Sequence, residues 1–160
     1  YGDWFSNLLH MMVDKVPSEI HNMCTINALC LETLPELLEK MVWFKSASKV
    51  YGPTLNYTLN ILRFPSFQSP LVLPDDLRNK FKGDIQKFLN NNVRHLEHME
   101  VNQTQRLIDY LDVVKTPHAG AAEQDKLQKD FKAFYSQYDR RNGKDFEKTF
   151  PIIGEWYRGI

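Results

Sequence analysis

The chain has 160 residues, with 20 basic and 20 acidic side chains and a formal net charge of zero. This length is typical of one domain, and 42% hydrophobic residues are enough to form a buried core. With a formal net charge of zero, nothing in the composition argues for a nucleic-acid or anionic-membrane partner. The sequence contains no hydrophobic run long enough to span a bilayer and no recognisable signal peptide, so no membrane partner is expected.

The first part of the chain predicts a helix followed by a strand–helix–strand unit. Apolar residues lie on one face of a helix that begins near residue 3. Residues 20–28 and 55–62 have apolar side chains at alternate positions, which predicts two strands. Between them an amphipathic helix begins at Leu34. A connection of this length is most simply a crossover between parallel strands, so we expect an α/β architecture.

Each predicted strand has one apolar face and one face rich in amide and hydroxyl groups. The apolar positions are Ile20, Cys24, Ile26 and Ala28 on the first strand, and Leu55, Tyr57, Leu59 and Ile61 on the second. Parallel strands that are covered on both faces are usually apolar throughout, so the polar face predicts the lining of a polar cavity. The alternative from the pattern is an antiparallel sheet with one face in water.

The rest of the chain is predicted to be mainly helical. The proline-rich segment 63–74 forms a loop, and a helix begins at Asp75 and ends near residue 92. Further helices are predicted at 103–114 and around Phe131, separated by a break at 116–120. The tail from residue 145 is dense in aromatic residues, and we expect it to dock on the body of the protein.

The residues that could carry chemistry are few. Cys24 and Cys30 are only six positions apart and poorly placed for a disulfide, so two reduced thiols in a cytoplasmic protein are expected. His95, Glu97 and His98 lack the spacing of a helical zinc site and are interpreted as solvated surface residues. The sequence has no phosphate-binding glycine loop and no nucleophile elbow.

Three stretches carry a resemblance to a known family: MCTINALCLETLPELLEKM, LNYTLNILRFPSFQSPLVLPDDLRNK and RRNGKDFEKTFPIIGEWYRGI. The preceding segment GDWFSNLL, the T-x-N strand from Thr25 and the Leu-Pro-Glu-Leu start of the next helix are also part of the resemblance. Through all of these features the chain resembles the twitch subfamily of radical S-adenosylmethionine (radical SAM) proteins. The resemblance implies that residues 1–92 form the C-terminal part of a partial (β/α)6 barrel. Residues 93–160 would then form a helical C-terminal extension.

The same resemblance implies a function. The family signature C-x3-C-x2-C, which holds an iron-sulfur cluster that binds S-adenosylmethionine, has no match in this sequence. The chain would therefore be the C-terminal portion of a radical SAM iron-sulfur oxidoreductase, contributing cofactor or substrate placement but inactive alone. The family's fifth and sixth strands help to hold the adenosine of the cofactor, and the matching residues are Thr25, Asn27 and Asn60. No catalytic or metal-binding residue is carried over, and neither cofactor is expected to be bound to this chain alone.

A second hypothesis is a non-catalytic α/β protein-interaction module. Two strands leave unpaired backbone groups at the edges of the sheet, and such edges pair readily with another chain. The expected partner is the N-terminal half of the same protein or a second copy bound through the exposed edge. Self-association is favoured over capping by the helical extension, because a second copy presents the same edge and can close a two-fold interface.

Overall fold

The computed structural model describes residues 2–14, 19–51, 53–112 and 121–160. The helices are α1 (Gly2–Val13), α2 (Leu34–Tyr51), α3 (Asp75–Asn92), α4 (His98–Asp112), α5 (Ala121–Asn142), α6 (Phe146–Thr149) and α7 (Pro151–Gly159). The strands are β1 (Glu19–Ile26) and β2 (Thr54–Ile61), and four short 3₁₀ helices are η1 (Leu29–Glu32), η2 (Ser66–Gln68), η3 (Pro70–Val72) and η4 (Val93–His95). The predicted break at 116–120 lies outside the described residues.

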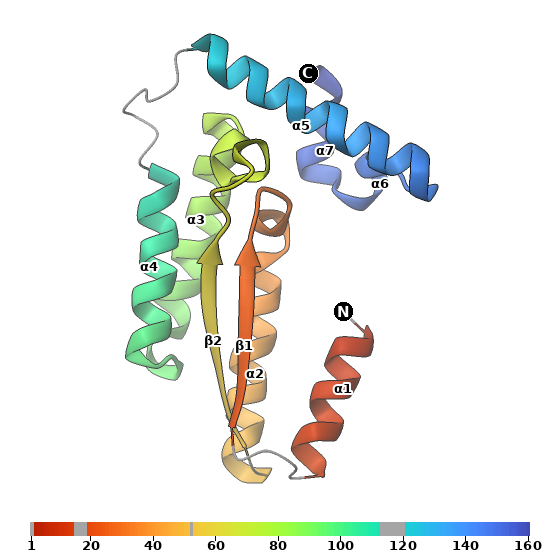
Figure 1. Cartoon of the computed structure of the whole chain (residues 1–160). Helices are drawn as coiled ribbons and strands as arrows, with labels where there is room; N and C mark the ends of the chain where they lie inside the picture. Colours follow the sequence, from red (N-terminus) through yellow and green to blue (C-terminus); the bar gives the residue numbers. More distant parts are fainter. Residues whose placement is uncertain (1, 15–18, 52, 113–120) are drawn as a thin grey trace.

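β1 and β2 pair in parallel, as the sequence predicted, and the antiparallel alternative is wrong. Ile20 lies opposite Leu55, and Ile26 lies opposite Ile61. α2 packs behind the strand pair (Figure 1) and buries Leu38 against their apolar face. The alternation of apolar and polar side chains therefore assigned the covered face correctly, and the length of the connection indicated the parallel pairing correctly.

The predicted partial (β/α)6 barrel, by contrast, is wrong. The structure is mostly helical, and the described residues contain two strands only. After β2 the chain enters the 3₁₀ helices η2 and η3 and continues into α3, without forming another described strand. α4 then returns along β2 (Figure 1), where side chains of the helix bond to the backbone of the strand. The sheet ends there because a helix occupies the position that a third strand would take.

The C-terminal helices form an aromatic cluster that packs at the carboxyl end of the strands (Figure 1). Phe131 on α5 is fully buried and lies within 6 Å of the rings of Phe146 (5.8 Å) and Trp156 (5.3 Å). The carboxylate of Glu32 accepts hydrogen bonds from the N–H groups of Ile152 (3.1 Å) and Ile153 (3.0 Å), at the first turn of α7. The predicted docking of the aromatic tail is therefore confirmed, and a carboxylate at a helix N-terminus helps to fix it.

α1 packs on the side of α2 through aromatic contacts. The ring of Phe5 stacks on Trp43 (5.8 Å) and tilts against Phe44 (4.6 Å), and Trp4 meets Phe44 edge to face.

In the part of the chain that the structure describes, no helix combines the length and the apolar character needed to cross a membrane.

Candidate functional site

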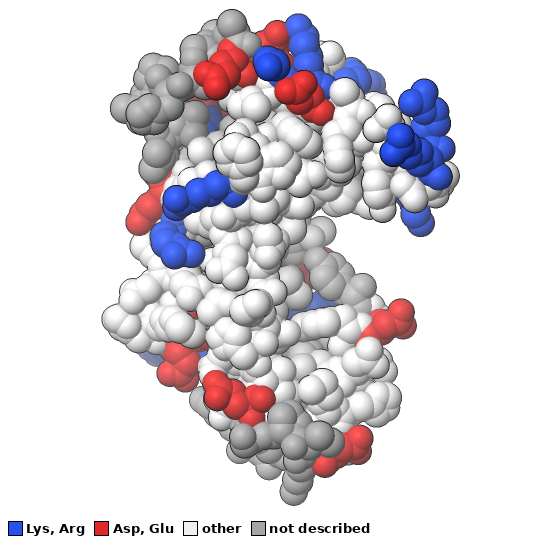
Figure 2. All heavy atoms as spheres, viewed as in Figure 1, with Lys and Arg blue, Asp and Glu red and all other residues white. Residues whose placement is uncertain are grey.

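The outward face of the strand pair is polar and uncharged over most of its length. His21, Met23 and Thr25 on β1 are exposed, and the register places them opposite Asn56, Thr58 and Asn60 on β2. The His21 ring lies 3.2 Å from the Thr58 hydroxyl, Nε2 to Oγ1. Figure 2 shows that the surface over the middle of the strands carries no Lys, Arg, Asp or Glu. This face offers hydrogen-bond donors and acceptors without a fixed charge.

The structure brings two of the three predicted cofactor-binding residues together. Thr25 and Asn60 are direct neighbours in the register, both exposed, near the carboxyl ends of the two strands. Asn27 follows the end of β1, and its side-chain oxygen accepts the N–H groups of Leu29 (3.0 Å) and Cys30 (3.1 Å). The Asn27 oxygen thus helps to begin η1, so only its amide nitrogen remains for a ligand. A role for these residues in cofactor binding stays a prediction.

Both cysteines are free thiols with a low tendency to ionise. Burial, with a smaller contribution from Cys30, raises the pKa of Cys24 to about 11. Burial also raises the pKa of Cys30, whose thiol donates to the carbonyl oxygen of Thr25 (Sγ to O, 3.4 Å). Thiolates are the cysteine form that binds metal, and two protonated thiols do not supply the three ligands of a radical SAM cluster. These residues therefore do not fit the iron-sulfur cluster.

α4 covers the outer edge of β2 with side chains that satisfy its backbone. Glu100 accepts the Tyr57 N–H (3.1 Å to Oε1) and Gln103 accepts the Leu59 N–H (2.5 Å to Oε1). Arg106 donates to the Leu59 carbonyl oxygen (Nη2 to O, 2.9 Å). Three side chains on one face of a helix therefore replace the backbone of a neighbouring strand. Sequence reasoning missed all three, because polar residues at intervals of three on a helix usually indicate a solvated face.

The outer edge of β1 is open. Leu62 donates its N–H to the carbonyl oxygen of Ile26 (2.9 Å), so the backbone of Ile26 points at β2. In a parallel pair the intervening residues point away, which directs the N–H groups of His21, Met23 and Thr25 out of the sheet. None of the described residues bonds to these three N–H groups. Met23, at the centre of the edge, is 75% exposed.

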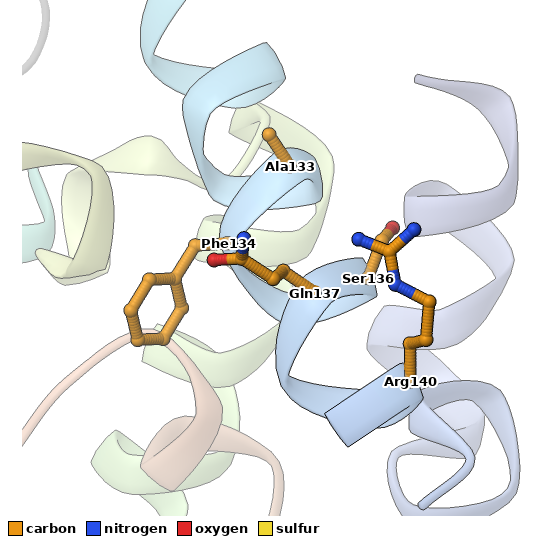
Figure 3. Close-up of a pocket in the computed structure, with 5 residues that line it drawn as sticks. All are labelled: Ala133, Phe134, Ser136, Gln137 and Arg140. Atoms are coloured by element: carbon orange, nitrogen blue, oxygen red, sulfur yellow. The ribbon is translucent and has the colours of Figure 1, made fainter. Parts of the chain in front are cut away.

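Two hollows lie away from the strand pair. One of about 380 Å³ lies along α5 and is lined by Phe134, Gln137 and Arg140 among others (Figure 3). The other, of about 340 Å³, lies between α2 and α3 and includes Glu36, Glu39, Asp84 and Lys87. Within the described ranges, no group of three or more His, Cys, Asp or Glu residues is arranged to hold a metal ion. Neither hollow is lined by a described residue of the polar strand face.

Comparison of the chain with protein-family models, with curated proteins and with solved structures gave no match.

Proposed function

We propose that this chain is the C-terminal portion of a radical SAM iron-sulfur oxidoreductase, in which it helps to place cofactor or substrate. The observation that carries this proposal is the pair Thr25 and Asn60, exposed side by side near the carboxyl ends of two parallel strands. Ligands of parallel sheets bind at that end of the strands. A hydroxyl and a carboxamide together supply the donors and acceptors that a purine or ribose requires.

In this proposal the chain is inactive by itself. Its two thiols do not fit an iron-sulfur cluster, so the cluster and the methionyl part of S-adenosylmethionine are held by another part of the enzyme. The chain contributes contacts to the adenosine part only. A cytoplasmic location belongs to the same proposal, because free thiols are typical of a reducing compartment.

Titration of the isolated chain with S-adenosylmethionine, followed by NMR of backbone and side-chain amides, tests this proposal. A half-site of two exposed side chains forms few contacts, so we expect weak binding, with Kd of about 1 mM or higher. The shifts should centre on Thr25 and Asn60. Thr25→Ala combined with Asn60→Ala should abolish them, because both polar groups are then missing.

Thr54→Ala is the matched control, because Thr54 is also an exposed threonine of the strand pair but lies at its amino end. This variant should leave the titration unchanged. Shifts that avoid the carboxyl ends of the strands, or that persist in the double variant, would contradict the proposed cofactor contact.

The second candidate is a non-catalytic interaction module, and the open edge of β1 is the observation that favours it. An added strand would satisfy the outward N–H groups of His21, Met23 and Thr25. In an antiparallel pair of two copies centred on Met23, His21 of each copy would lie opposite Thr25 of the other. This arrangement brings no like charges together and covers the exposed Met23. The partner is then a second copy of the chain or the polypeptide that holds the iron-sulfur cluster.

A further inference from the structure

The second half of α5 and the turn that follows it present aromatic and cationic side chains to solvent. Phe134 is 41% exposed and Tyr138 is 48% exposed. Arg140, Arg141 and Lys144 follow at the end of the helix and are all exposed. Figure 2 shows Lys and Arg side chains gathered at this end of the molecule, in contrast to the uncharged surface over the strands. We call these five residues the α5 basic surface.

The cations of the α5 basic surface have no acidic partner among the described side chains. The neighbouring carboxylates are occupied by backbone groups: Asp139 accepts the Phe146 N–H (2.7 Å), and Asp145 accepts the Lys148 N–H (3.1 Å) at the start of α6. These acids stabilise the turn into α6. Arg140, Arg141 and Lys144 therefore keep cationic donors with which the carboxylates of a partner could pair.

A groove accompanies this charge. Its volume is about 380 Å³, and the described residues that line it belong to α5. Figure 3 shows Phe134 and Arg140 extending to opposite sides of Gln137, with the Arg140 guanidinium beside Ser136. The Ser136 hydroxyl lies 2.7 Å from the Tyr157 hydroxyl, which joins the groove to α7. One side of the groove is thus aromatic and the other cationic, while the Gln137 amide between them can bond to a peptide backbone.

We propose that the α5 basic surface binds an acidic polypeptide segment that also carries an apolar side chain. Carboxylates of the segment would pair with Arg140 and Arg141, for which the planar guanidinium is well suited. The apolar side chain would pack on Phe134. A polypeptide fits better than a nucleic acid, because the whole chain has no net positive charge and the groove is only one helix face wide. This inference is independent of the radical SAM proposal.

The test uses the whole chain and a labelled synthetic peptide, Glu-Glu-Phe-Leu-Glu-Glu, with binding measured by fluorescence anisotropy at low and high salt. We expect binding that weakens as salt rises, since exposed charges are screened. Replacing the Glu residues of the peptide by Gln, or its Phe and Leu by Ala, should each weaken binding. Arg140→Glu should weaken it about tenfold or more, because an attraction becomes a repulsion.

Arg94→Glu is the matched control, since Arg94 is also an exposed arginine but lies on η4, between α3 and α4. It should leave the affinity unchanged, and circular dichroism should show both variants folded. The proposal is overturned if the peptide does not bind, or if Arg140→Glu binds it as tightly as the unmodified chain. It is also overturned if single-stranded oligo-dT or phosphatidylserine vesicles bind more tightly than the peptide.

Discussion

Glu100→Ala is expected to lower the free energy of unfolding by about 3–5 kcal/mol. This is the typical cost of removing one partner of a buried ion pair while the other stays buried. Glu100 is fully buried, and its Oε2 atom accepts the Lys45 ammonium (2.5 Å) and the Glu97 N–H (2.7 Å). Its Oε1 atom accepts the N–H of Tyr57. The alanine variant leaves a buried ammonium without a counter-charge and a strand N–H without an acceptor.

Urea denaturation, monitored by circular dichroism, measures this decrease in the free energy of unfolding. Asp84→Ala is the control, because it removes an ion pair with Lys80 in which both side chains are 47% exposed. Such pairs contribute about 0–1 kcal/mol, so little change is expected. If Glu100→Ala destabilises the protein no more than Asp84→Ala, then Glu100 does not tie α4 to β2 as the structure shows.

Phe131→Ala is expected to cost about 3–5 kcal/mol as well, for a different reason. Phe131 is fully buried, and its ring centroid lies 4.6 Å from that of Tyr135 and 6.2 Å from that of Tyr157. The smaller side chain leaves a cavity where α5, α6 and α7 meet, and the surrounding rings fill it only in part. The near-ultraviolet circular dichroism of the aromatic cluster should weaken along with the unfolding free energy.

Tyr138→Ala provides the comparison on the same helix. Tyr138 is largely exposed, so its removal should change the unfolding free energy by no more than about 0.5 kcal/mol. If the two variants lower the unfolding free energy equally, then Phe131 is not the centre of the C-terminal core.

The two strands and the helices next to them could be predicted, because the spacing of their apolar side chains along the sequence indicates each element. Ile20, Leu55 and Leu59 fall on the covered face as the period of two requires, and the length of the connection through α2 indicates parallel pairing. The predicted helix that begins at Leu34 is α2, and the one that begins at Asp75 is α3. These predictions are correct because the conformation of each element depends mainly on residues that are close to one another in the sequence.

The sheet as a whole could not be predicted, because its extent depends on contacts between distant residues. Glu100, Gln103 and Arg106 are polar and lie on a helix, so nothing in their spacing shows that they bond to β2. The resemblance to a barrel family predicted a partial barrel, whereas the structure has a helix along the outer edge of β2. The sequence pattern thus located the second strand but not its neighbour on the outer side.

The candidate site was predicted in part. Alternation placed Thr25 and Asn60 on the same polar face, and the register makes them neighbours. The family resemblance predicts a site role for Asn27, and alternation places it on the same polar face. However, β1 ends at Ile26, and the Asn27 oxygen accepts the N–H groups of Leu29 and Cys30 at the start of η1. An asparagine just before a tight turn often bonds to the backbone two or three residues later, and this was the signal that alternation concealed.

We conclude that α4 covers one edge of the strand pair, while the other edge is open to a partner. Amide hydrogen exchange in dilute protein tests it most directly, because the same pair of strands provides both kinds of N–H group. The Tyr57 and Leu59 amides, which donate to Glu100 and Gln103, should exchange slowly. The Met23 and Thr25 amides on the outer edge of β1 should exchange rapidly. Equal protection of all four amides, or faster exchange at Tyr57 and Leu59, would contradict the claim.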